Sequence, residues 1–210
     1  MLLQVERLCF DYPQRALFKD FDADISAGVT LVLGDDGAGK TTLLRLLAGE
    51  LAAQAGRLQV REVSLQSQPQ AYQRHIFWAD PQTQALDAVT PLQYFAQTRQ
   101  RYPDFWPPDA PQFHELLAGL SLTEHLDKPL YMLSTGSKRK VWLASAFAAG
   151  ASVTLLDDPF AALDKPSIRF VLQQLAAGAC ETERAWVVAH YEALDGVPLA
   201  QVIDLDVCGG

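Results

Sequence analysis

The chain has 210 residues, of which 49% are hydrophobic, so it can bury the core of one α/β domain with a small inserted subdomain. A formal net charge of −8 disfavours nucleic-acid partners, because proteins that bind nucleic acids usually carry a broad basic surface. No apolar run approaches the length of a membrane span, and the three cysteines lack metal-ligand spacing, so we expect free thiols in a reducing cytosol.

Two strands are predicted at the start of the chain, because apolar residues recur among polar ones over 2–10 and 20–25. A turn that contains Tyr12 and Pro13 separates them. Residues 31–33 are all apolar and follow Gly28 closely. This short run is typical of a buried strand.

A glycine-rich loop follows that strand and leads into a helix expected over 43–49. Gly34, Gly39, Lys40 and Thr41 occupy the required positions of a phosphate-binding loop, in which Lys40 reaches the β- and γ-phosphates and Thr41 binds Mg²⁺. Glycines let the backbone curl so that N–H groups face phosphate oxygens, and the helix adds its positive end. The alternative is a glycine-rich turn without a ligand. The predicted nucleotide-binding residues of the loop are Gly34, Gly37, Ala38, Gly39, Lys40, Thr41 and Thr42.

The middle of the chain changes character. A strand region at 56–65 is followed by a glutamine-rich stretch at 66–73, which we expect to be a surface loop, and by a short buried strand at 76–79. Between residues 80 and 132 lie most of the prolines, and the apolar positions take on helical spacing. This segment is predicted to be an inserted helical excursion.

Strands are expected again in the last third of the chain, at 153–156, 185–189 and 202–205. The prediction is therefore one domain over 1–210. Its core covers approximately 1–80 and 150–210, and a helical subdomain covers approximately 81–149. The insertion is small enough to pack onto the core without forming a separate domain.

Two acids, Asp157 and Asp158, end the apolar run at 153–156. A carboxylate at the end of a buried strand beside a phosphate loop commonly holds the magnesium shell, and Asp157 is placed for that role. The alternative is a strand that ends in an acidic turn. The phosphate loop upstream favours the magnesium site.

The sequence Leu-Ser-Thr-Gly-Ser at 133–137 opens an alanine-rich helix that reaches about residue 149. Here the chain resembles the ATP-binding cassette (ABC) ATPases, whose hallmark is an LSGGQ-like signature at the start of a helix. Thr135 and Ser137 depart from that signature. Ser134 is also a plain helix N-cap. The resemblance implies that the free N–H groups at Ser134 and Gly136 bind the γ-phosphate held by another subunit.

Further residues follow the family's order along the chain. The resemblance implies that Tyr12 stacks on adenine, that Gln82 senses magnesium and the attacking water, and that His190 contacts the γ-phosphate. Phe10 is a rival for the stacking role, and Gln84 is an alternative to Gln82. Plainer interpretations are an aromatic packed on the core, a surface glutamine and a structural histidine.

The resemblance extends from Tyr12 to His190 and implies a fold class. This is an α/β fold with a P-loop NTPase core, an antiparallel β subdomain and an inserted α-helical subdomain. The catalytic set that the resemblance implies is Asp158, His190 and Gln82. The magnesium ligands that it implies are Thr41, Gln82 and Asp157.

Two further features depart from the family. Asp158 stands where a glutamate usually polarises the attacking water, and its reach is shorter by about 1.5 Å, one carbon–carbon bond. We therefore expect slow hydrolysis. Asp35 and Asp36 place two acids inside the phosphate loop, and we expect their side chains to be solvated or to contact an opposite subunit.

The favoured function is the ATP-binding and ATP-hydrolysing subunit of an ABC transporter, with ATP and Mg²⁺ as cofactors. As the resemblance implies, it closes on ATP as a homodimer, or with another cassette, and drives a separate membrane permease from the cytoplasmic face. Alternatives are a regulatory ATP-binding module, a soluble ABC protein, and a generic P-loop kinase or GTPase. The single cassette is similar to small export-type subunits, including the haem-exporter kind. Aromatics at 102–106 are a possible permease contact, although packing within the helical segment is favoured.

Overall fold

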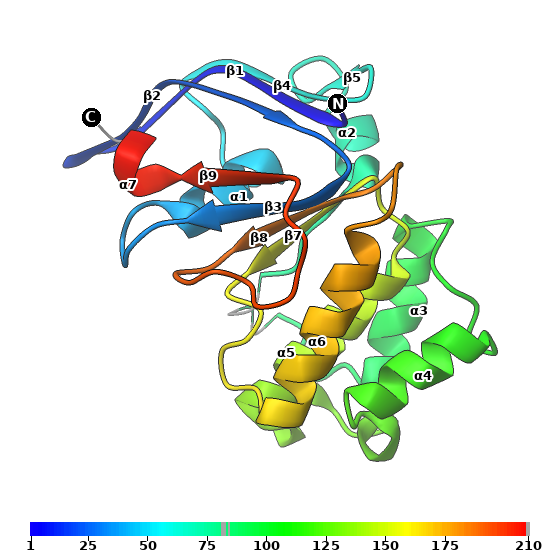
Figure 1. The fold of residues 1–210 in the computed structure, drawn as a ribbon. Helices are drawn as coiled ribbons and strands as arrows, with labels where there is room; N and C mark the ends of the chain where they lie inside the picture. Colours follow the sequence, from blue (N-terminus) through cyan, green and yellow to red (C-terminus); the bar gives the residue numbers. More distant parts are fainter. Residues whose placement is uncertain (81–82, 84, 209–210) are drawn as a thin grey trace.

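Two sheets form the frame of the molecule in a computed structural model that describes residues 1–80, 83 and 85–208 (Figure 1). The smaller sheet is antiparallel, in the order β2-β1-β4-β5. Its strands are β1 (Leu3–Tyr12), β2 (Arg15–Ile25), β4 (Ala55–Val60) and β5 (Val63–Ser64). The first two make one long hairpin, so the predicted turn at Tyr12 and Pro13 is confirmed, with the second strand starting earlier than expected.

The larger sheet is parallel, in the order β6-β7-β8-β3-β9. Its strands are β3 (Gly28–Leu33), β6 (Ile76–Phe77), β7 (Val153–Asp157), β8 (Ala185–Ala189) and β9 (Gln201–Asp204). Asp157 and Val32 both pair with Ala189, so β7, β8 and β3 end at one edge. Crossovers of parallel strands place ligand sites at such an edge.

Both faces of the parallel sheet are covered. Along β8, Ala185, Val187 and Ala189 pack with the antiparallel sheet and α1 (Lys40–Leu47). Trp186 and Val188 pack on the other side, with the core shared by α5 (Thr135–Ala148) and α6 (Lys165–Gly178). Figure 1 shows α1 between the two sheets and α5 and α6 on the opposite side of the parallel one. Two-sided burial explains why these strands are almost wholly apolar.

The helical segment packs beside α5. It contains α3 (Pro91–Arg101) and α4 (Pro111–Gly119), followed by 3₁₀ turns at Thr123–His125 and Leu130–Met132. Aromatic contacts join these elements: Phe95 meets Phe113 edge to face at 5.3 Å, and Tyr94 meets Trp142 of α5 at 4.6 Å. The helical character predicted for this segment is confirmed, whereas its assignment as a subdomain over 81–149 stays a prediction.

Tyr102 and Phe105 are buried in this core, and Trp106 is half-buried against it. Their packing within the helical segment, the favoured expectation, is confirmed. Cys9 and Cys180 are free thiols. Within the described ranges, no helix is long and apolar enough to cross a membrane.

The prediction of a surface loop for the glutamine-rich stretch is wrong. Instead of a loop it contains α2 (Pro69–His75), with Pro69 in the first turn, where the missing N–H has no helical partner to lose. Tyr72 is fully buried and its hydroxyl donates to the Leu47 carbonyl at 2.8 Å. The buried ring of Tyr72 thus anchors a helix in a stretch whose glutamine-rich composition favours an exposed loop. The last element of the described residues is the short α7 (Leu205–Cys208).

Candidate functional site

The loop between β3 and α1 has the curled backbone that glycines allow. Gly37 and Gly39 have φ values of 82° and 106°, in the left-handed region that residues with a Cβ rarely adopt. Gly39 also stands at the N-cap of α1, and no side chain caps that helix. The first amides of α1 therefore border the loop, where an anion is favoured.

Lys40 folds back across this loop. Its ammonium group donates to the carbonyl of Gly34 at 2.5 Å and to that of Asp35 at 2.9 Å. Asp35 and Asp36 are both exposed, and the Asp35 amide donates to the Asp206 carboxylate at 2.9 Å. The positive charge is thus held at the mouth of the loop, where a polyphosphate can reach it.

Thr41 connects the loop to the end of β7. Its hydroxyl donates to Oδ2 of Asp157 at 2.7 Å. Burial raises the pKa of Asp157 above its ordinary value; the neighbouring Asp158 adds to the rise, and the hydrogen bond from Thr41 opposes it. A hydroxyl and a carboxylate oxygen suit Mg²⁺, a cation that takes few protein ligands and retains water and phosphate oxygens. The donor set fits the predicted magnesium ligands Thr41 and Asp157.

Asp158 and His190 form a second pair beside the first. Oδ1 of Asp158 lies 3.1 Å from Nδ1 of His190. The carboxylate is about half exposed, whereas the imidazole is buried with Phe160 and Tyr191 against its ring. The Asp158 side chain therefore keeps access to solvent while the histidine holds it from one side.

These residues surround one cleft at the carboxyl edge of the parallel sheet. They come from β2, the phosphate loop, α1, α5 and the ends of β7 and β8. The lining residues are Arg15, Asp36, Gly37, Gly39, Lys40, Thr41, Thr42, Arg139, Asp157, Asp158, His190 and Tyr191. Lysine, arginine and backbone amides next to three carboxylates and several hydroxyls suit a phosphorylated ligand with a divalent cation.

Arg15, Arg139 and Tyr191 line the cleft although sequence reasoning did not select them. Arg15 donates to the Gly37 carbonyl at 2.6 Å and so supports the phosphate loop from β2. Arg15 lies shortly after Tyr12, but it belongs to no sequence motif that would identify it. Arg139 belongs to the basic run 138–140, which gives no sign of which member faces the cleft.

Tyr12 lies near the cleft but is not one of its lining residues. Its hydroxyl is 3.3 Å from Oγ1 of Thr42, and its ring meets Phe10 edge to face at 5.0 Å. The ring is 41% exposed, so it remains available for stacking. Gln82 and its alternative Gln84 lie outside the described residues.

Ser134 and Gly136 stand apart from the cleft described above. Ser134 caps α5 and accepts a hydrogen bond from the Ser137 amide at 3.1 Å. A Cβ on Gly136 would come within 2.3 Å of the Ala162 carbonyl, so only glycine fits there. Ser134 and Thr135 are exposed at this helix start. Within one chain, the two halves of the predicted site do not meet.

Known proteins resemble this chain in sequence. The sequence model of the ABC transporter family matches residues 18–161. The cytochrome c biogenesis ATP-binding export protein CcmA of Pseudomonas savastanoi pv. phaseolicola is 32% identical over 98% of this chain and 94% of its own. The protein of that name from Pseudomonas syringae pv. syringae is 33% identical, with the same shares covered.

A solved ABC transporter ATP-binding protein from Pyrococcus furiosus matches in three dimensions. The TM-score is 0.79, with 22% identity and coverage of 99% of this chain and 98% of that one. At this identity the likeness speaks for the fold alone. The predicted fold class, an α/β P-loop NTPase with an antiparallel sheet, is confirmed.

Proposed function

The chain belongs to the ABC transporter family, as an ATP-binding subunit that drives a membrane transporter, and from that premise we propose how its cleft holds ATP and Mg²⁺. The observation that carries the proposal is the meeting of Lys40 and Thr41 with Asp157, Asp158 and His190 in one cleft. A lysine, a hydroxyl and a carboxylate suit the binding of phosphates and Mg²⁺, and the second carboxylate and the imidazole can position the attacking water.

Each residue then has a role. Lys40 and the loop residues Gly34, Gly37, Ala38, Gly39 and Thr42 bind the phosphates through the ammonium group and backbone amides. Thr41 and Asp157 hold Mg²⁺, with Gln82 as a third partner; when bound, the cation neutralises phosphate charge. Asp158 polarises the attacking water, and His190 orients Asp158 and reaches the γ-phosphate. Tyr12 stacks on the adenine ring.

Hydrolysis is proposed to be slow in the isolated subunit. The Asp158 carboxylate is shorter than the glutamate usual in the family and is drawn toward His190 at 3.1 Å. A misplacement of about 1 Å can cost about a hundredfold in rate. Faster turnover then requires a partner that moves the carboxylate or the water.

A second copy is proposed to complete the site. Ser134 and Gly136 lie at the exposed start of α5 and outside the lining of the cleft in their own chain. A two-fold arrangement of two copies would bring this helix start to the phosphates of the opposite cleft, where its amides bind the γ-phosphate. The pair is a homodimer, or a heterodimer with another cassette, and ATP holds it closed.

The nucleotide role is tested on Lys40→Ala. We expect the affinity for ATP to fall at least about tenfold, because the variant loses the ammonium group that reaches the phosphates. Isothermal titration with ATP and Mg²⁺ measures it. Lys19→Ala, which removes an exposed lysine from β2, is the control and should bind as the wild type does. Equal affinities for all three proteins would contradict the proposed site.

The transport role is proposed from the curated relatives, which are named as cytochrome c biogenesis ATP-binding export proteins. This chain would then act at the cytoplasmic face of the membrane, bound to a multi-span permease, in the supply of c-type cytochromes. Deletion of the gene should lower the amount of c-type cytochrome, measured by haem staining, and the wild-type gene should restore it. The Lys40→Ala gene should not. Wild-type cytochrome levels in the deletion strain would contradict the assignment.

A further inference from the structure

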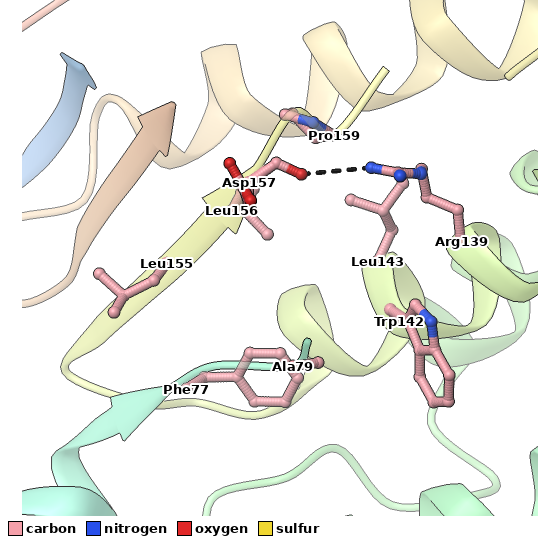
Figure 2. A pocket seen from close by; sticks show the side chains of 9 residues that line it. All are labelled: Phe77, Ala79, Arg139, Trp142, Leu143, Leu155, Leu156, Asp157 and Pro159. Carbon is pink, nitrogen blue, oxygen red and sulfur yellow. Dashed lines mark hydrogen bonds between the residues drawn. The ribbon is translucent and has the colours of Figure 1, made fainter. Parts of the chain in front are cut away.

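Arg139 connects the helix that starts at Ser134 to the end of β7. Its guanidinium donates from one terminal nitrogen to two successive main-chain carbonyls, that of Asp157 at 3.2 Å and that of Asp158. Figure 2 shows the side chain reaching from α5 to the end of the β7 strand, with the bond to Asp157 as a dashed line. A residue of α5 thus holds the backbone from which both carboxylates extend.

The guanidinium lies half-buried above an apolar pocket. Besides Arg139 and Asp157, the pocket is lined by Phe77, Ala79, Trp142, Leu143, Leu155, Leu156 and Pro159 (Figure 2). Burial lowers the pKa of Arg139 from its ordinary value, and the carboxylates of Asp158 and Asp157 oppose that change. In apolar surroundings a hydrogen bond from a charged donor is stronger than in water. Both hydrogen bonds that Arg139 makes with described residues end on these carbonyls.

The backbone of Asp158 needs such support. Its φ is 42°, a left-handed conformation that costs energy in a residue with a Cβ. Its amide donates to the Ala189 carbonyl at 2.9 Å, and its carbonyl accepts from Arg139 and from the Ala161 amide at 3.2 Å. Contacts at both ends of the residue therefore set the direction of its side chain, which ends 3.1 Å from His190.

We propose that Arg139 is a positioning residue for ATP hydrolysis, which holds the Asp158 peptide so that its carboxylate faces the attacking water. The inference rests on the proposed function, in which Asp158 polarises that water. Because Arg139 lies in the first turns of α5, five residues after Ser134, it also ties the placement of α5 to the placement of the carboxylate. A movement of α5 relative to β7 changes hydrolysis through this side chain.

The test compares Arg139→Gln and Arg139→Lys in steady-state ATPase assays on the full-length protein. We expect kcat to fall about tenfold in Arg139→Gln, with KM for ATP within about twofold of the wild type, because a shifted carboxylate impairs the transition state and not ground-state binding. Arg139→Lys keeps the charge and one donor and should recover part of the rate. Lys138→Gln removes the neighbouring charge, which pairs with Asp87 at 2.6 Å, and is the matched control with unchanged kcat.

A double-mutant cycle gives a readout that a merely structural role would not move. If Arg139 acts through Asp158, then Arg139→Gln should slow Asp158→Asn by less than about twofold, since the carboxylate it positions is already gone. Additive losses in the cycle overturn the proposal, and so does a raised KM with unchanged kcat, which would make Arg139 a nucleotide contact. Thermal melting shows whether Arg139→Gln is folded. If it is not, the ATPase rate of Arg139→Lys tests the proposal. Lack of turnover in the wild type contradicts the proposed function itself, whereas normal turnover in Arg139→Gln contradicts only this inference.

Discussion

At the scale of single residues, Oδ1 of Asp158 lies 3.1 Å from Nδ1 of His190, and this contact limits where the carboxylate can reach. The imidazole is buried and its backbone amide donates to the Val32 carbonyl at 3.1 Å, so it is held by the sheet. A side chain one methylene longer would keep the histidine within reach and extend farther into the cleft.

Asp158→Glu should raise the steady-state ATPase rate. The longer side chain restores about 1.5 Å of reach toward the attacking water, and an error of about 1 Å can change a rate by about a hundredfold. A colorimetric phosphate assay measures the rate at saturating ATP, with Asp158→Asn as a control whose rate is low but measurable. No gain, or a loss, would show that the aspartate is already well placed.

Asp157 shows the tension between stability and function. Its raised pKa means that the folded chain disfavours the ionised carboxylate, chiefly because the group is buried. The folded protein then holds the proton more tightly than the unfolded one, so ionisation lowers stability as the pH rises through the interval above the ordinary value of 3.8.

Asp157→Asn should therefore melt higher than the wild type at pH 7 in the absence of nucleotide, by at least about 2 °C, although it loses ATPase activity. The amide oxygen still accepts the Thr41 hydroxyl, while the charge is gone. The difference should shrink as the pH is lowered toward 4, where the wild-type carboxyl takes up its proton. Differential scanning calorimetry over this range measures both effects. A variant that melts lower at every pH would contradict the argument.

At the scale of elements, α5 and α6 are joined by one charged contact. Lys140 on α5 is almost buried, and its ammonium group lies 2.6 Å from the Asp164 carboxylate. Asp164 is also the N-cap of α6 and accepts from the Ser167 amide at 2.8 Å. The hydrogen bond from Lys140 is the main cause of the lowered pKa of Asp164, so this stabilisation is present above pH 3.8 and is lost as the pH falls below it.

Two substitutions separate the cap from the charge. Asp164→Asn keeps the cap and loses the pairing, and should lower the unfolding free energy by about 1 kcal/mol. Asp164→Ala loses both and should cost about 2 kcal/mol. Urea unfolding at pH 7 measures the difference, with Asp109→Ala as an exposed control. Equal losses in the two variants would mean that the cap contributes nothing.

At the scale of the whole molecule, the arrangement of the chain leaves the proposed binding groups on two separate surfaces. The cleft lies at the carboxyl edge of the parallel sheet, and Ser134 lies at the start of α5, outside the cleft lining. A chain that works alone would leave the second surface without a use in ATP binding. In a pair of chains related by a two-fold axis, the cleft of each chain would face the start of α5 of the other, so both surfaces would be used in each of the two sites.

Mixing two inactive variants tests this arrangement. Lys40→Ala removes the phosphate contact of the cleft. Ser134→Asp keeps a good N-cap but places a negative charge where the γ-phosphate of the opposite cleft would bind. Each variant alone should be inactive, and an equimolar mixture should recover about one quarter of the wild-type ATPase rate, because half of the dimers carry one intact site. No recovery on mixing would contradict a shared site.

The sequence predicts five residues that the structure brings into one cleft, namely Lys40, Thr41, Asp157, Asp158 and His190. Local motif spacing indicates Lys40, Thr41 and Asp157, whereas the family resemblance implies the roles of Asp158 and His190. The helix α2 is not predicted by the sequence because Tyr72, which anchors it, stands alone among glutamines. The burial of this ring depends on contacts with residues far away in the sequence.

What the sequence determined by itself is the phosphate loop and the strands that carry it. Glycines at 37 and 39 allow a left-handed backbone at little cost, and the apolar runs favour buried strands, so both signals are local in the sequence. Only the tertiary structure decided that Arg15 supports the loop and that Arg139 holds the end of β7. Both arginines donate to main-chain carbonyls. Because every residue has such a carbonyl, no pattern of side chains in the sequence indicates which carbonyls the arginines will bind.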